Sequence, residues 1–294
     1  MQVELDAGAY FKEFIAPRFD DCVHINRNPR FEAEYLNLKA KGGRAIIYSP
    51  HQSHSDGWAM AVTVEYLMEL AREARVDFPG VVLPIARSML TGHQGLAVKY
   101  LTELSIPILK EKGVLNLPYT RKKDEFKYGL KKNVAEVLGI GRAVRNGYDL
   151  SYFPEASVQG GRHKNFLGFV FGGEIYGMGK VDDPDGFLDF YGLMDKFGRV
   201  RGEIFFVPVI IEGGNRFFGA DLTIPTMELV TSLFQKAQSP IEVNIERPLT
   251  TLRIADEMSC AFGSDKERLN DFLMRKLTTK LSPPAQGIYR SLSY

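Results

Sequence analysis

Short apolar runs alternate with longer helical segments along most of this chain, and this alternation restricts the possible folds more than any other feature. Runs of strand length lie at residues 44–48, 81–86, 105–109, 150–153, 203–211 and 241–245. Segments with helical spacing of apolar residues lie at residues 57–75, 94–104, 126–146 and 265–281. Strands that alternate with helices predict an α/β fold with a mostly parallel central sheet flanked by helices. In such sheets, sites form where loops leave the carboxyl ends of strands.

Two further stretches complete the predicted organisation. Aromatic residues at helical spacing predict a short amphipathic helix over residues 5–15. We therefore expect an N-terminal helical segment at residues 1–40, followed by one α/β domain at residues 41–294. Residues 156–200 are rich in glycine, so we expect loops and short elements there.

The composition excludes several classes of protein. The chain has 294 residues, of which 45% are hydrophobic and 25% are charged, and its net charge is +1. These values are ordinary for a globular protein, and they exclude a disordered tail, a collagen-like repeat and a highly charged nucleic-acid binder. Cys22 and Cys260 lie far apart in the sequence, which fits neither a disulfide framework nor a zinc finger. A reducing compartment is therefore expected.

The apolar runs are too short to cross a membrane. None approaches the roughly 18–20 uninterrupted apolar residues of a spanning helix. Residues 1–17 carry both acidic and basic side chains and show no signal-peptide pattern. We therefore expect a cytoplasmic protein that at most lies on a membrane surface as a peripheral protein.

One segment is strongly basic within this nearly neutral chain. Residues 110–132 hold eight Lys or Arg residues against three Asp or Glu residues. A local excess of positive charge suggests an acidic partner, such as acyl carrier protein, the phosphates of coenzyme A or an anionic membrane surface. An ordinary solvated helix face explains the same pattern equally well. Nucleic acid is not an expected partner, because no recognised binding motif accompanies the segment.

The most informative polar stretch follows the first predicted strand. His51 and Asp56 are separated by four residues, between a buried strand and the start of a helix. If the loop folds the carboxylate back onto the imidazole, it fixes the tautomer and leaves the other ring nitrogen as a base. Such a base can deprotonate an alcohol that attacks an acyl group. The alternative is that Asp56, Ser53 or Ser55 only caps the helix.

Two other functions are compatible with the same stretch. A metal-dependent hydrolase could use His51, His54 and Asp56 as ligands, since histidine and carboxylate groups at short spacing suit zinc. The remaining histidines form no second cluster, and we expect no metal and treat His54 as a structural or solvent-facing neighbour. A non-catalytic module that binds an acyl chain or a carrier protein is the other alternative.

Four blocks of the sequence resemble the glycerolipid acyltransferases, which acylate glycerol-3-phosphate or lysophosphatidic acid. His-Gln-Ser-His-Ser-Asp at 51–56 resembles the family's His-x4-Asp block. Leu-Pro-Ile-Ala-Arg at 83–87 stands in place of Phe-Ile-x-Arg, and Phe-Pro-Glu-Ala-Ser at 153–157 in place of Phe-Pro-Glu-Gly-Thr-Arg-Ser. Phe-Val-Pro-Val-Ile at 206–210 resembles the fourth block, a Val-Pro within an apolar strand. The blocks follow the family order and cover about half of the chain.

The resemblance implies a glycerol-3-phosphate acyltransferase-like fold and a role in phospholipid biosynthesis. It implies transfer of a fatty acyl group from acyl-CoA or acyl carrier protein to a hydroxyl of glycerol-3-phosphate or a lysophospholipid acceptor. His51 would be the general base and Asp56 would orient it, with direct attack, no acyl-enzyme and no resident cofactor. Four residues are implied to bind substrate: Arg87 and Arg162 at a phosphate, and Glu155 and Ser157 at the acceptor. The alternative for each arginine is a surface or structural ion pair. Glu155 could instead hold the loop, and Ser157 could make a turn hydrogen bond.

The third block departs from the family pattern. Ala156 and Val158 stand where the family has glycine and arginine. An arginine returns at Arg162 within Gly-Gly-Arg, which resembles the soluble plastid glycerol-3-phosphate acyltransferases. The chain therefore looks closer to soluble members, and the altered block leaves the acceptor open.

Overall fold

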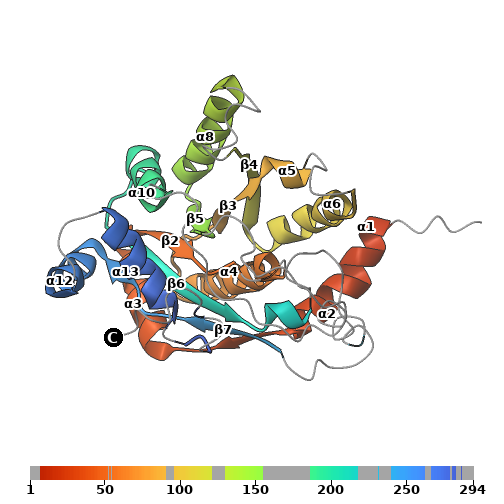
Figure 1. Ribbon diagram of the computed structural model, residues 1–294, viewed down its shortest axis with the longest axis horizontal. Helices are drawn as coiled ribbons and strands as arrows, with labels where there is room; N and C mark the ends of the chain where they lie inside the picture. The colour runs from red at the N-terminus through yellow and green to blue at the C-terminus, as the bar shows by residue number, and fades with distance from the viewer. Residues whose placement is uncertain are drawn as a thin grey trace, which may run out of the picture.

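A mixed eight-stranded sheet lies at the centre of the protein (Figure 1). The computed structural model describes residues 7–51, 53, 55–90, 96–120, 130–154, 186–217, 231, 240–261, 266–278, 280–282 and 286. The strands are β1 (Val23–Asn26), β2 (Arg44–Tyr48), β3 (Val81–Ala86), β4 (Val114–Tyr119), β5 (Asp149–Tyr152), β6 (Ile204–Glu212), β7 (Ile241–Ile245) and β8 (Leu249–Thr250). Their order is β1-β7-β6-β2-β5-β3-β4, with β8 paired to β6.

Five neighbouring strands of this sheet are parallel. β2 runs parallel to β5 and β6, and β3 runs parallel to β4 and β5. β7 and β8 run antiparallel to β6, and β1 is parallel to β7. The predicted α/β class with a mostly parallel sheet is therefore confirmed. Because β6, β2, β5, β3 and β4 point the same way, their carboxyl ends meet at one edge of the sheet.

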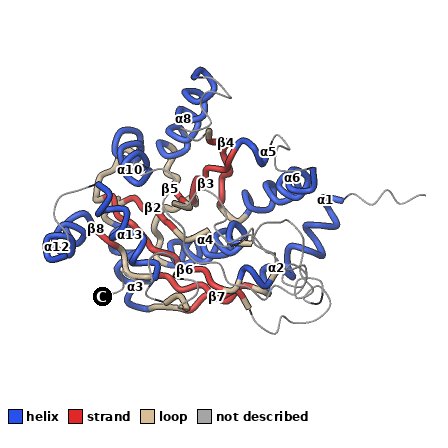
Figure 2. Tube along the Cα trace, viewed as in Figure 1, coloured by secondary structure: helices blue, strands red, loops and turns tan. Residues whose placement is uncertain are grey.

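Helices cover both faces of the sheet (Figure 2). α3, α4 and α6 contribute buried residues on one face, and α8, α10 and α13 contribute them on the other. The helices are α1 (Ala7–Tyr10), the π-helix η1 (Phe11–Ile15), α2 (Ala16–Asp21), α3 (Pro29–Ala40), α4 (Asp56–Glu73), α5 (Arg87–Leu90), α6 (Leu96–Glu111), α8 (Leu130–Arg145), α10 (Gly186–Phe197), the 3-10 helix η3 (Gly214–Arg216), α12 (Thr251–Ala261) and α13 (Lys266–Thr278).

The strand β2 shows why the sheet needs two covered faces. All five of its residues are buried. Ala45 and Ile47 belong to the apolar cluster under α4, and Ile46 and Tyr48 belong to the cluster on the opposite face. A strand that is apolar on both sides is typical of a parallel sheet between two helical layers.

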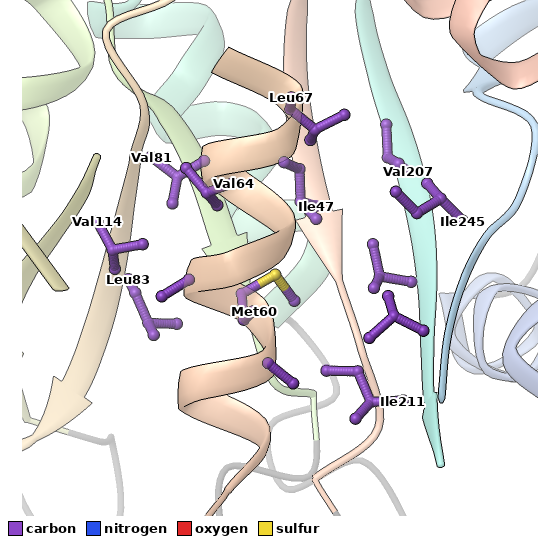
Figure 3. Packing of buried hydrophobic residues seen from close by; sticks show 14 of the residues in the cluster. Ile47, Met60, Val64, Leu67, Val81, Leu83, Val114, Val207, Ile211 and Ile245 are labelled. Carbon is purple, nitrogen blue, oxygen red and sulfur yellow. The ribbon is translucent and has the colours of Figure 1, made fainter. Parts of the chain in front are cut away.

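The helix α4 is anchored by this packing. Ten of its eighteen residues are buried. Figure 3 shows Met60, Val64 and Leu67 of α4 against the sheet, close to Ile47 of β2 and Val81 of β3. The helix predicted at residues 57–75 is thus confirmed, and its packing fixes where its first turn lies relative to the strand ends.

The strand predicted at residues 105–109 is wrong. These residues lie within α6, and the strand follows at β4 instead. A short apolar run can be a strand or a turn of a buried helix, and periodicity alone does not separate them. Pro107 also disfavours a helix interior, yet Ile108 and Leu109 are buried on the α4 face and hold the helix there.

Two other segments differ in detail from the expected organisation. Residues 186–197, inside the stretch expected to hold loops and short elements, form α10, a helix of twelve residues. Residues 155–185 lie outside the described residues. The segment 1–40 contains α3, but it also supplies β1, which pairs with β7 and joins the central sheet. Among the described residues, no helix combines the length and hydropathy needed to cross a membrane.

A buried ion cluster lies where β2 and β5 begin. Asp149 is fully buried and accepts hydrogen bonds from Lys39 Nζ at 2.9 Å and Arg44 Nε at 2.7 Å. Arg44 also donates to the backbone carbonyls of Val144, Tyr148 and Gly198. The cluster joins α3, β2 and β5 at the end of the sheet opposite to the carboxyl ends of these strands.

Candidate active site

The register of the parallel strands brings three loops to one edge of the sheet. Tyr48 at the end of β2 is level with Tyr152 at the end of β5 and with Pro208 in β6. The loop after β2 leads to His51, the loop after β5 begins at Phe153, and the loop after β6 begins at Gly213. This edge is where an open α/β sheet forms its binding sites.

His51 and Asp56 lie together at this edge. The Nδ1 atom of His51 is 3.3 Å from Oδ2 of Asp56. The His51 side chain is 18% exposed and the Asp56 side chain only 1%. A carboxylate on Nδ1 favours the tautomer with its proton on that nitrogen, so Nε2 is the nitrogen that can accept a proton. The predicted pairing of these two side chains is therefore present.

The carboxylate of Asp56 is held by the backbone as well as by His51. The N–H of Ser53 donates to Asp56 Oδ2 at 2.7 Å. Asp56 is also the first residue of α4, where the helix dipole favours a negative charge. The helix N-cap is Ser55, and its side chain makes no capping hydrogen bond. Asp56 is thus a buried, oriented carboxylate facing the imidazole.

Two serines and a glycine hold the loop between β2 and α4 in place through hydrogen bonds. The Oγ atoms of Ser53 and Ser55 are 2.9 Å apart, and Ser55 Oγ donates to the carbonyl of Gly214 at 3.1 Å. Gly213 has a φ of +94°, which favours glycine, and this turn after β6 brings Gly214 to the loop. A Cβ on Gly214 would lie 2.6 Å from Ser55 Oγ and 2.9 Å from Asp56 Oδ1.

The imidazole of His51 stacks on Phe153. The ring centroids are 4.6 Å apart and the ring planes differ by 23°. Phe153 directly follows β5 and packs against the apolar cluster under α4. Stacking restricts rotation of the imidazole about its χ2 angle, so Phe153 and Asp56 together define the direction of His51.

Arg87 reaches the same edge from β3. It is the first residue of α5, and its Nε donates to Glu136 Oε1 at 2.7 Å, with Nη2 donating to the same oxygen. Glu136 lies on α8 and its side chain is 5% exposed, against 24% for Arg87. The arginine implied to bind a phosphate therefore sits beside a buried carboxylate.

Other predicted site residues lie outside the described residues. They include three of the four residues implied to bind substrate, together with His54 of the zinc alternative: Glu155, Ser157, Arg162 and His54. Within the described part of the chain, no group of three or more His, Cys, Asp or Glu residues is placed to hold a metal ion.

The basic segment at residues 110–132 is described only in part. Lys110 is exposed, but Lys112 is buried and binds Asp20 at 2.8 Å and Glu65 at 2.6 Å. Burial alone would lower the pKa of Lys112, yet the two carboxylates outweigh it and raise the pKa. Lys112 is therefore a structural ion-pair residue rather than part of a basic face.

Three features of the site were not predicted from the sequence: the stacking of Phe153 on His51, the Gly213-Gly214 turn and the contact of Glu136 with Arg87. Phe153 follows a predicted strand and precedes Pro-Glu, and this position is the signal that marks it. The Gly213-Gly214 pair after β6 also marks a tight approach of backbone. Glu136 gave no signal, because a single glutamate in an amphipathic helix is usually solvated.

Comparison with known proteins adds no relative to this picture. No family model matches the chain, and no curated protein matches it.

Proposed function

We propose that this protein is an acyltransferase that moves a fatty acyl group from a thioester to a hydroxyl of glycerol-3-phosphate or a related phosphorylated acceptor. The observation that carries the proposal is the contact between His51 Nδ1 and the buried carboxylate of Asp56. That arrangement sits at the carboxyl edge of a parallel sheet, with a helix starting beside it. We also propose that the α/β fold is of the glycerol-3-phosphate acyltransferase type.

His51 acts as the general base in this proposal. Its Nε2 takes the proton of the acceptor hydroxyl while the oxygen attacks the thioester carbonyl. Asp56 orients the ring and stabilises the imidazolium that forms. The proton then passes to the departing thiolate, and no acyl-enzyme or resident cofactor is needed. General-base assistance of this kind contributes roughly 10²–10⁴ in rate.

The start of α4 supplies the donor for the oxyanion. Among the described residues, three of its first four N–H groups have acceptors: Asp56 N–H binds Ser53 O, and the N–H groups of Trp58 and Ala59 bind Ser55 O. We assign the N–H of Gly57 to the developing negative charge. The positive end of the helix dipole lies at the same place and adds to the stabilisation.

Arg87 is proposed to bind the acceptor phosphate, because a guanidinium can donate two parallel hydrogen bonds to it. Glu155, Ser157 and Arg162 keep their proposed places at the acceptor. The acyl donor is acyl-CoA or acyl carrier protein, and residues 110–132 are proposed to meet the acidic donor or an anionic membrane surface, with the protein acting from the cytoplasm.

A donor-by-acceptor activity screen tests this function. Labelled acyl-CoA and acyl carrier protein are each offered with glycerol-3-phosphate, lysophosphatidic acid and non-phosphorylated alcohols. Transfer of label to a phosphorylated acceptor is the expected result. Hydrolysis without transfer, accompanied by stoichiometric zinc, would instead support the metal-dependent hydrolase, and binding of thioesters without any turnover would support a binding module.

A further inference from the structure

A carboxylate oxygen close to Arg87 is buried without a partner. Glu136 Oε2 has no hydrogen bond to any of the described residues, although its side chain is 5% exposed. Both hydrogen bonds from Arg87 go to the other oxygen, Oε1. A buried carboxylate oxygen nearly always has a hydrogen-bond donor, because losing water without replacement is costly.

The Arg87–Glu136 pair lies near the same carboxyl edge of the sheet as His51, so a ligand bound at this edge can supply the donor that Oε2 lacks. Arg87 directly follows β3, and β3 is two strands away from β2 in the sheet order. Neighbouring strands are about 4.8 Å apart, so the carboxyl ends of β2 and β3 are about 10 Å apart across the sheet. A molecule of three or four carbons with a terminal phosphate can span that distance.

We propose that Glu136 is a specificity-determining residue that binds a second hydroxyl of the acceptor. An ionised carboxylate only accepts hydrogen bonds, so its ligand must be a donor, and the proposed acceptor is an alcohol. Since Glu136 contacts Arg87, the hydroxyl bound at Oε2 is next to the phosphate bound at Arg87. The acceptor class is therefore a small phosphorylated diol, in which one hydroxyl meets His51 and the other meets Glu136. This inference rests on the proposed function, because it assumes that Arg87 holds a phosphate.

A pair of ligands and one variant test the assignment. Glycerol-3-phosphate carries both hydroxyls, and 3-hydroxypropyl phosphate lacks the one next to the phosphate-bearing carbon. Equilibrium binding of each is measured by calorimetry without an acyl donor, in the wild type and in Glu136→Gln. Glutamine keeps the shape and one acceptor for Arg87, but it presents an amide instead of a full carboxylate to the ligand.

The wild type is expected to bind glycerol-3-phosphate about tenfold or more tightly than the analogue, as befits a hydrogen bond to a charged group. Glu136→Gln is expected to reduce that preference, because a neutral amide replaces the charged acceptor, while its affinity for the analogue stays within about twofold. A purely structural Glu136 would weaken both ligands alike, and that result would overturn the assignment.

The wild-type comparison stands even if the variant does not fold. Equal affinity of the wild type for the two ligands, or no binding of either, would overturn the assignment without any variant. Acyl transfer is measured separately. A tenfold binding preference for glycerol-3-phosphate without acyl transfer would support the role of Glu136 and refute the proposed function. Acyl transfer without that binding preference would support the proposed function and refute the role of Glu136.

Discussion

Single residues between β2 and α4 determine the direction of the proposed base. Asp56 contacts His51 on one side and the Ser53 backbone on the other, and Phe153 stacks against the imidazole. Gly214 touches the same loop with no room for a side chain. The site therefore depends on a close approach of backbone from β6 as well as on the two side chains of the motif.

Replacing Gly214 with alanine should lower kcat for acyl transfer. Its new Cβ would clash with Ser55 Oγ and Asp56 Oδ1, so the loop or the carboxylate that faces His51 must shift. A misplacement of about 1 Å can cost about 10²-fold in rate. The measurement is kcat for Gly214→Ala and for Gly192→Ala, a control in α10 with nothing within 4 Å of its added Cβ. Equal activity in the two variants would show that the close approach of Gly214 is not needed.

Replacing Arg87 with alanine should act on binding of the acceptor. The loss of two hydrogen bonds to a phosphate is expected to raise KM for glycerol-3-phosphate by about tenfold or more. The KM for the acyl donor is the internal control and should change by less than about twofold. An unchanged KM for the phosphorylated acceptor would remove the phosphate role of Arg87.

At the scale of elements, the ion cluster at the start of β2 and β5 holds three of them together. Asp149 binds Lys39 of α3 and Arg44 of β2 inside the protein. The cluster fixes the strand that leads into His51 at its opposite end. Buried ion pairs add little net stability over apolar packing, but breaking one leaves an uncompensated charge.

Replacing Asp149 with asparagine should therefore destabilise the fold strongly. We expect a loss of about 3–5 kcal/mol in the free energy of unfolding, measured by urea denaturation. The matched control is Glu69→Gln, since Glu69 pairs with Arg72 on the exposed face of α4 and should cost at most about 1 kcal/mol. A loss at Asp149 no larger than the loss at Glu69 would show that the buried cluster does not tie these elements together.

The elements also show where sequence patterns suffice and where they fail. Strands such as β2 and β7 were predicted with their observed bounds, because their apolar runs are set off by glycine or proline. The residues 105–109 were assigned wrongly, because tertiary packing of Ile108 and Leu109 decides between helix and strand. β1 alternates apolar and polar residues, Val-His-Ile-Asn, but four residues are too few to separate a strand from chance, and pairing with β7 decides it.

At the scale of the whole molecule, the ionised side chain of Glu32 makes the free energy of unfolding depend on pH. Glu32 of α3 accepts hydrogen bonds from Arg27 at 3.0 Å and from Tyr66 of α4 at 2.6 Å. The Arg27 guanidinium is the main cause that holds the pKa of Glu32 below its ordinary value of 4.5. Burial, together with Glu32, raises the pKa of Tyr66 to about 12.

The stability contributed by Glu32 should be present at neutral pH and lost in acid. Because the pKa is lower in the folded protein, the carboxylate favours folding above about pH 4.5, and the benefit disappears as pH falls through the folded pKa. The difference in unfolding free energy between wild type and Glu32→Gln is therefore expected to be largest near pH 7 and to shrink as the pH falls below 4.5 and through the folded pKa of Glu32. A difference that stays constant over this range would contradict the expectation.

The candidate site was predictable as far as local sequence spacing reaches. The His51–Asp56 contact spans four intervening residues, so a strand end and a helix start were enough to suggest it. Contacts that join distant segments, such as Arg87 with Glu136 or Ser55 with Gly214, depend on strand order and helix placement. No local pattern encodes those, because they arise only when the sheet has assembled.

The central claim, a His51 general base oriented by Asp56, is tested most directly by comparing two neighbouring histidines. His51→Ala and His54→Ala are assayed for acyl transfer to glycerol-3-phosphate, with circular dichroism as the check on folding. His51→Ala is expected to lower kcat by roughly 10²–10⁴ while His54→Ala retains activity within a few fold. Wild-type activity in a folded His51→Ala protein would contradict the claim, and equal losses in both variants would point to a metal site instead.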